Sequence, residues 1–259
     1  MKFLGVALAL LLGLAGFCLM VQPVQATASA MIQNEMAWLD AAGYYHVTGE
    51  VKNTGDVWLH YLIAGVRVTG TFLDADGAQI DAVDSFVQLD YLPPGEVGPF
   101  DVLEFNTTRS AQIVSYTLAL AYEASTPLTV KLVVQNISAS RDILGDLVVT
   151  GQAQNQGDAF SKFTRVVGTF YDAEGRVAAA AMAFTDPTDL PPGAIYPFKL
   201  VVVYASQADR VVHYTIVAES QVYTSVPEWP WPMLTAGMAL MLTIVALRKK
   251  DRLVSWNVG

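Results

Sequence analysis

The central part of the chain reads twice, and this internal repeat limits the possible fold more than any other feature of the sequence. The segment GEVKNTGD, at residues 49–56, returns as GQAQNQGD at 151–158, an offset of 102 residues. The segment VTGTFLDADG, at 68–77, returns as VVGTFYDAEG at 166–175, an offset of 98. The first copy therefore carries four extra residues, which we assign to a loop between residues 58 and 65 because loops tolerate insertions.

Within each copy, apolar and polar residues alternate with a period of two. In the first copy Val47 and Val51 belong to the apolar set, while His46, Thr48 and Glu50 belong to the polar set. The second copy keeps the same phase over residues 147–154. Such alternation predicts strands that have one face in a core and the opposite face outside it.

Clusters of Gly, Pro, Asn and Asp separate these strands, and no convincing helical stretch interrupts them. This pattern predicts an all-β chain of two tandem immunoglobulin-like antiparallel β-sandwiches. We place the first sandwich at residues 27–125 and the second at 126–224, because Ser125-Thr126-Pro127 breaks the strand pattern. A linker this short predicts a rod of two modules.

The N-terminus has the features of a secretory signal peptide. A basic residue, Lys2, is followed by an uncharged run from Phe3 to Val21 and by small residues that favour cleavage after Ala26. Cleavage after Ala28 or Ala30 fits almost as well, and an uncleaved N-terminal anchor is the alternative. We therefore assign residues 1–26 to the signal peptide and expect the bulk of the chain to be exported.

The C-terminus has the features of a single membrane span. Residues 229–247 carry no charge and, as a helix, reach about 28 Å, close to the thickness of a bilayer core. A basic cluster starts at Arg248, so residues 248–259 are expected to form a short cytoplasmic tail, while Trp229 and Trp231 suit the opposite interface. A buried core helix is the alternative for this run. The predicted location is a single-pass protein of the cell membrane with its ectodomain outside.

Charge and cysteine usage exclude several classes of function. Between residues 27 and 228 there are ten basic and twenty-three acidic residues, a net charge of −13, which argues against nucleic acid as a partner. The only cysteine, Cys18, lies inside the predicted signal peptide. After cleavage the chain would have no thiol for disulfides, metal binding or catalysis.

The repeated motifs resemble a known domain family. The order Val51 to Gly55, Phe72 to Gly77, Pro94-Gly95 and Phe100, with Phe170 to Gly175 in the second copy, is similar to the FxLYD domain of prokaryotic surface proteins. This resemblance implies an extracytoplasmic β-sandwich without known catalytic residues, and it covers most of residues 44–220.

The C-terminal segment has a second, weaker resemblance. Residues 226–229, VPEW, followed by an apolar span and a basic cluster, resemble the sorting signals of exosortases and archaeosortases. Trp229 departs from the Pro or Phe that commonly follows Pro-Glu in those signals. A permanent anchor therefore stays the default prediction, with enzymatic processing as the alternative.

One acidic cluster in each copy has the opening of a calcium loop. Asp74 and Asp76 in the first copy, and Asp172 and Glu174 in the second, are weak candidates for calcium ligands. Position 85, where such a loop needs a glutamate, is Ser85, and tight hairpin turns carry the same residues. We favour the turn and predict no metal or other cofactor.

The sequence carries no recognisable catalytic constellation. It has three histidines, no Gly-x-Ser-x-Gly elbow and no Gly-rich phosphate loop, so we predict that the protein is not an enzyme. The leading hypothesis is a membrane-anchored structural or interaction protein of the cell envelope, whose partners are envelope proteins or glycans. The alternative is a receptor module that binds a glycan, peptide or small ligand through sandwich loops, with Trp58, His60 and Tyr61 as the candidate ligand loop.

Overall fold

The computed structural model describes residues 26–62, 64–225 and 227. This part of the chain is all-β, with two helices of four residues each. The predicted signal peptide apart from Ala26, the predicted span at 229–247 and the tail at 248–259 lie outside the described residues. Within the described ranges, no helix has both the length and the hydrophobicity that a membrane crossing requires.

The first half of the chain, residues 27–125, builds two main antiparallel sheets and a short antiparallel pair of strands. One sheet has the order β1-β2-β6 and the other the order β5-β4-β7, while β3 pairs with β8. The strands are β1 (Ala30–Leu39), β2 (Tyr45–Asn53), β3 (Trp58–His60), β4 (Arg67–Leu73), β5 (Gln79–Phe86), β6 (Val97–Glu104), β7 (Ser115–Ala121) and β8 (Glu123–Ser125), with helix α2 (Thr107–Ser110) between β6 and β7.

The second half, residues 126–225, repeats this arrangement. A sheet of order β10-β11-β14 corresponds to β1-β2-β6, and a sheet of order β13-β12-β15-β16-β9 corresponds to β5-β4-β7 with two short additions. The strands are β9 (Thr129–Val130), β10 (Leu132–Arg141), β11 (Leu147–Asn155), β12 (Arg165–Tyr171), β13 (Val177–Phe184), β14 (Ile195–Val202), β15 (His213–Glu219) and β16 (Tyr223–Thr224), and helix α3 (Ala205–Ala208) lies between β14 and β15.

Each half has its own hydrophobic core between its two main sheets. Phe72 and Phe100 are fully buried in the first core, and Phe170 and Phe198 occupy the matching places in the second. The repeated glycine of β2 and β11 allows these cores to close: a Cβ on Gly49 would lie 2.6 Å from Cζ of Phe100, and a Cβ on Gly151 would lie 2.6 Å from Cζ of Phe198. The alternation predicted for these strands is thus confirmed on their inward faces.

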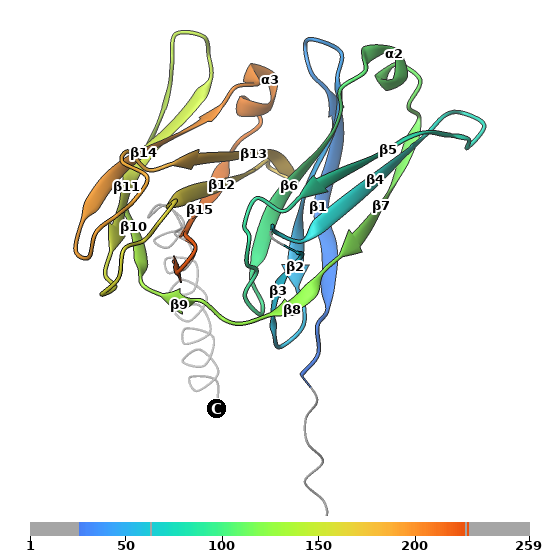
Figure 1. The fold of residues 1–259 in the computed structure, drawn as a ribbon. Helices are drawn as coiled ribbons and strands as arrows, with labels where there is room; N and C mark the ends of the chain where they lie inside the picture. Colours follow the sequence, from blue (N-terminus) through green and yellow to red (C-terminus); the bar gives the residue numbers. More distant parts are fainter. Residues whose placement is uncertain (1–25, 63, 226, 228–259) are drawn as a thin grey trace, which may run out of the picture.

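The two halves lie side by side rather than end to end, so the predicted rod is wrong (Figure 1). The β13-β12-β15 sheet of the second half faces the β1-β2-β6 sheet of the first, which gives four layers of sheet across the molecule (Figure 1). The polar set of β2 is buried as a consequence: His46, Thr48 and Glu50 are 0–2% exposed. The prediction that only one face of the strand is buried is wrong for β2; on the matching face of β11 Thr150 is exposed, although Val148 is buried.

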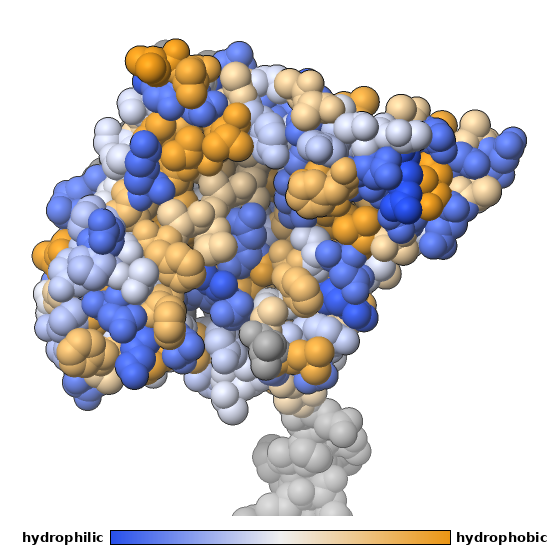
Figure 2. Space-filling view, turned by 45° about the horizontal axis from the view of Figure 1, so that its top comes forward, coloured by the Kyte–Doolittle hydropathy of each residue, from blue (hydrophilic) through white to orange (hydrophobic). Residues whose placement is uncertain are grey.

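The β1–β2 turn, the β10–β11 turn and the two short helices gather at one end of the molecule, opposite the segment that joins β8 to β9 (Figure 1). The turn between β10 and β11 carries two strongly exposed apolar residues, Ile143 and Leu144. Figure 2, in which this end is turned towards the viewer, shows hydrophobic residues gathered there between hydrophilic ones.

Candidate functional site

The surface between the two halves, which we call the joint, brings together several deeply buried polar side chains, among them Thr48 and Glu50. Thr48 of β2 donates a hydrogen bond from Oγ1 to the carbonyl oxygen of Val177 in β13, at 2.6 Å. Val167 of β12 is 2% exposed and packs into the hydrophobic core of the first half. Apolar packing and buried polar contacts therefore both connect the halves.

Glu50 is the centre of a hydrogen-bond network at the joint. Its Oε1 accepts from Nε2 of Gln33 and from Nδ2 of Asn34, both at 2.7 Å, and its Oε2 accepts from the hydroxyl of Tyr171 at 2.6 Å. Gln33 is the cross-strand neighbour of Glu50 in the β1–β2 register. Asn34 reaches the same oxygen because β1 has an irregularity between Gln33 and Met36, where Asn34 adopts a left-handed conformation with φ of 57°.

Tyr171 and His213 form the facing wall, which belongs to the second half. They are partners in the β12–β15 register, and their rings stack with centroids 4.6 Å apart. Burial, reinforced by the neighbouring carboxylate of Glu50, raises the pKa of Tyr171, so its hydroxyl stays protonated and donates. Burial also lowers the pKa of His213, although the carboxylates of Asp172 and Glu50 oppose this shift.

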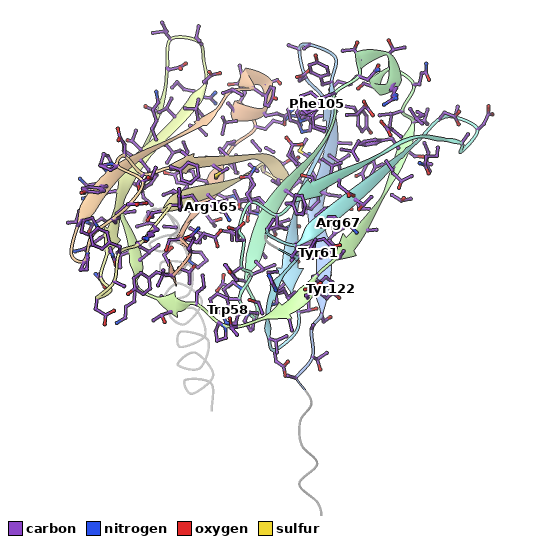
Figure 3. The ribbon with its side chains drawn as sticks, viewed as in Figure 1. Trp58, Tyr61, Arg67, Phe105, Tyr122 and Arg165 are labelled. Carbon is purple, nitrogen blue, oxygen red and sulfur yellow. The ribbon has the colours of Figure 1, made fainter. Side chains whose placement is uncertain are left out.

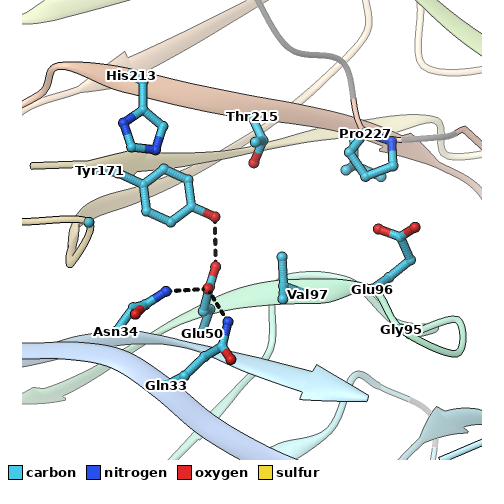
Figure 4. Close-up of a pocket in the computed structure, with 12 residues that line it drawn as sticks. Gln33, Asn34, Glu50, Gly95, Glu96, Val97, Tyr171, His213, Thr215 and Pro227 are labelled. Carbon is cyan, nitrogen blue, oxygen red and sulfur yellow. Dashed lines mark hydrogen bonds between the residues drawn. The ribbon is translucent and has the colours of Figure 1, made fainter. Parts of the chain in front are cut away.

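A pocket of about 570 Å³ opens beside this network. The first half contributes Gln33, Asn34, Glu50 and the turn residues around Glu96, and the second half contributes Tyr171, His213 and Thr215 (Figure 4). Glu96 lies in the turn that precedes β6, and its carboxylate points into the space between the two halves (Figure 4). Burial raises the pKa of Glu96. The volume is in the range typical of sites for small ligands.

A charged cluster connects the halves at a second point. Arg165 of β12 is an ion-pair partner of Glu219 in β15 and of Asp90, which lies in the first half, with an N–O distance of 2.6 Å to Asp90. The backbone N–H of Asp90 also donates to Oε1 of Glu219. Burial raises the pKa of Glu219 to about 7, even though Arg165 and this N–H stabilise the charged form. Burial tends to lower the pKa of Arg165, but its two acidic partners outweigh this and raise it.

A third contact between the halves is aromatic. Trp38 of β1 stacks on His46 of β2, with ring centroids 4.1 Å apart, and Tyr204 of the second half meets both rings edge-on. His46 is fully buried, and its Nδ1 lies 2.9 Å from a carboxylate oxygen of Asp101. Together the three contacts attach the second half along much of the β1-β2-β6 sheet.

The residues proposed as a ligand loop, Trp58, His60 and Tyr61, are not among the residues that line the pocket. Trp58 and His60 belong to β3, which pairs with β8 (Figure 3). The ring of His60 stacks on Tyr91, and the ring of Tyr61 lies 4.8 Å from the guanidinium carbon of Arg67. These side chains are thus engaged within the first half.

The four weak calcium candidates lie in two equivalent hairpin turns. Oδ1 of Asp74 accepts from the N–H groups of Asp76 and Ala78, and Oδ1 of Asp172 accepts from those of Glu174 and Arg176. Each aspartate thus stabilises its own turn, as Asx turns do. In the described part of the chain, no three His, Cys, Asp or Glu side chains come together as metal ligands.

The residues that line the pocket were not among the predicted site residues. Glu50 and Tyr171 are 121 positions apart in the sequence, and nothing local marks either of them. The two copies of the repeat differ at Glu50, Glu96, Tyr171 and His213, with Gln152, Ala194, Leu73 and Ser115 at the matching places, but they differ at many other positions too, so this difference did not single out the pocket.

No family model matches the sequence, and no curated protein matches it either. Among solved structures, red sea bream transglutaminase is similar over 76% of this chain and 31% of its own, with 14% identity and a TM-score of 0.24. The exo-chitosanase CsxA of Amycolatopsis orientalis is similar over 76% of this chain and 26% of its own, with 10% identity and a TM-score of 0.28. A β-glucuronidase of glycoside hydrolase family 2 is similar over 72% of this chain and 23% of its own, with 13% identity and a TM-score of 0.25. The chain thus spans less than a third of each of these proteins.

Proposed function

We propose that this chain is a membrane-anchored extracytoplasmic interaction protein of the cell envelope, without a catalytic role. In this proposal each half is an immunoglobulin-like sandwich of the FxLYD type, exported by the signal peptide at residues 1–26. The apolar run at 229–247 holds the ectodomain on the membrane, and residues 248–259 stay in the cytoplasm. The order of export signal, repeated β unit, apolar run and basic cluster supports this arrangement.

The fixed packing of the two halves at the joint is the observation that supports an interaction role. A flexible spacer would need only a linker between its modules, whereas here the polar face of β2 is buried against the second half. The hydrogen bonds of Thr48 and Glu50, the ion pair of Arg165 with Asp90 and the aromatic contact of Tyr204 hold the halves in one relative orientation. A partner would therefore meet a surface with defined geometry, to which both halves contribute.

Fractionation and intact mass of the native protein test this proposal. We expect the full chain in the membrane fraction, beginning shortly after Ala26 and ending at Gly259. We also expect protease added to intact cells to degrade both halves. A chain that keeps Met1 and is recovered from the cytosol contradicts the proposal. A mass that ends near Glu228 replaces the permanent anchor with processing by a sorting enzyme.

A ligand receptor is the second candidate function, and the pocket at the joint favours it. The contacts of His60 and Tyr61 within the first half make their loop the weaker candidate site. If Trp58→Ala abolishes binding of a glycan or peptide that Glu96→Ala leaves intact, the loop rather than the joint is the binding site.

A further inference from the structure

We propose that the pocket at the joint binds a small organic cation through its ammonium or guanidinium group. This inference goes beyond the proposed function and does not depend on the membrane anchor. The cation would lie between the carboxylates of Glu50 and Glu96 on the first half and the Tyr171–His213 wall on the second (Figure 4). A free amine and the side chain of a lysine or arginine in a partner protein share this chemistry.

The walls of the pocket are rich in hydrogen-bond acceptors. Two carboxylates, two side-chain amide oxygens and the hydroxyl of Thr215 line it, and none of its described lining residues is a lysine or arginine. Gln33 and Asn34 each donate one side-chain N–H to Glu50, which orients their amides, and their side-chain oxygens are acceptors. Val97, Val217 and Pro227 add apolar surface that suits the hydrocarbon part of an amine. Anionic ligands are disfavoured in such a pocket.

The second copy of the repeat is an internal control for the two carboxylates. Gln152 occupies the place of Glu50, and Nδ2 of Asn136 donates to its side-chain oxygen at 2.7 Å, as Nδ2 of Asn34 donates to Glu50. Ala194 occupies the place of Glu96. A neutral residue is therefore compatible with the same backbone, and at the position of Glu50 it accepts the same hydrogen bond. Burying a carboxylate is unfavourable unless it is compensated, and of these two acids only Glu50 has hydrogen-bond donors in the fold.

Glu96 is the residue of the pocket at which a bound cation would have the clearest effect. Glu96 is half-buried, its carboxylate makes no hydrogen bond or ion pair with the described residues, and burial raises its pKa. Glu50, in contrast, has three donors. A bound cation would supply the missing counter-charge at Glu96 while using the negative charge of Glu50 at the same time.

The histidines provide a site-specific readout of binding. Of the three in the chain, only His213 lines the pocket, whereas His46 lies against Trp38 and His60 against Tyr91. We would label the imidazole groups of the full chain with carbon-13, keep the protein in a non-ionic detergent, and titrate 1,4-diaminobutane. The uncharged 1,4-butanediol and the anionic succinate are controls of similar length.

We expect the diamine to shift the His213 resonance saturably and to lower its pKa further, since a bound cation disfavours a second positive charge. The His46 and His60 resonances should not move. The diol and succinate should have no effect at the same concentrations. No shift at His213, or equal shifts with the diol, would overturn the proposal.

Variants taken from the repeat itself locate the site. Glu96→Ala and Glu50→Gln introduce the residues of the second copy, so the backbone is known to accept them, and each should weaken diamine binding about tenfold or more. Glu123→Gln removes an exposed charge that does not line the pocket and should leave the affinity unchanged. Unchanged binding in both pocket variants would overturn the assignment.

A parallel titration distinguishes the two sources of the cation. We would use the capped tripeptide Gly-Lys-Gly and its Gly-Gln-Gly counterpart. Tighter binding of the lysine peptide than of the diamine assigns the pocket to a basic side chain of a protein partner. The reverse order assigns it to a free amine. Loss of binding in any arm leaves the membrane location of the chain untouched, so the two proposals fail separately.

Discussion

At the scale of single residues, two buried asparagines explain the most regular motif of the repeat. Asn53 and Asn155 are fully buried. Nδ2 of Asn53 donates to the carbonyl oxygens of Val57 and Leu92, and its Oδ1 accepts from the N–H of Gly55. Asn155 makes the same three bonds in the second half. The sequence indicated a turn here, but the side chain also ties this turn to a distant backbone segment, at Leu92 in the first half and Leu190 in the second.

We predict that Asn155→Ala lowers the free energy of unfolding by about 2 to 4 kcal/mol, because it removes the hydrogen bonds donated to the carbonyl oxygens of Ala159 and Leu190 and the one accepted from the N–H of Gly157. Urea denaturation of the full chain in detergent would measure this. Asn155→Asp keeps the acceptor for Gly157 and loses only the two donated bonds, so it should be nearly as destabilising. A small effect of Asn155→Asp would mean that the acceptor carries the motif.

Glu219 should make the stability depend on pH. Its pKa is about 7 in the folded protein because of burial and near 4.5 in the unfolded chain, so the folded state binds the proton more tightly. Stability contributed by this group is fully present below about pH 4.5 and is lost as the pH rises to about 7, by about 3 kcal/mol.

The difference between wild type and Glu219→Gln isolates this effect, because the other carboxyl groups are common to both. Denaturation at a series of pH values should show wild-type stability falling relative to the variant between about pH 4.5 and pH 7. Parallel profiles for the two proteins would show that Arg165 keeps Glu219 ionised throughout.

At the scale of elements, the same type of hairpin turn occurs in both halves, with different residues at its tip. Asp40 closes the β1–β2 turn through Ala42 and Tyr44, and Asp142 closes the β10–β11 turn in the same way. Gly43 and Gly145 both have φ of 87°. The tip of the first turn is Ala41-Ala42, whereas that of the second is Ile143-Leu144. The turn itself therefore does not need the two large apolar side chains.

We predict that the double substitution Ile143→Ala and Leu144→Ala changes the free energy of unfolding by less than about 0.5 kcal/mol, because both side chains are strongly exposed. Gly145→Ala is the contrasting variant, and its left-handed backbone should cost about 1 kcal/mol. Thermal melts of the variants would check both values. A large loss with the double variant would mean that the tip has a structural role.

At the scale of the whole molecule, packing at the joint determines which faces of the sheets are exposed and which are covered. The β10-β11-β14 and β5-β4-β7 sheets form the outer layers, while the sheets between them are covered on both faces (Figure 1). Equivalent strands therefore have different surroundings in the two halves. Thr48 is 1% exposed at the joint, and its counterpart Thr150 is exposed on the outer sheet.

We predict that Thr48→Val combined with Tyr171→Phe loosens the joint while both halves stay folded, because it removes the hydrogen bonds to Val177 and Glu50. Spin labels at Ala41 and Leu144, one in each half, would report this by electron–electron double resonance. We expect one narrow distance distribution in wild type and a broader one in the variant. Thr150→Val is the matched control and should leave the distribution narrow.

The sequence by itself determined the local features of this protein. The period of two identified the strands, because alternate side chains of a strand point to opposite faces, and Gly and Asp marked the turns for equally local reasons. The repeat indicated that the two halves share one arrangement of sheets. These features depend on residues that are close together in the chain.

Only the tertiary structure decided what lies against the polar face of β2. Glu50 reads as an ordinary outward residue, and its burial depends on Tyr171 and the second half. The same alternation describes a face in solvent and a face against another domain, so the pattern could not distinguish them. The halves pack side by side because apolar residues such as Val167 are buried at the joint and its polar groups find partners there, and that combination exists only in the folded chain.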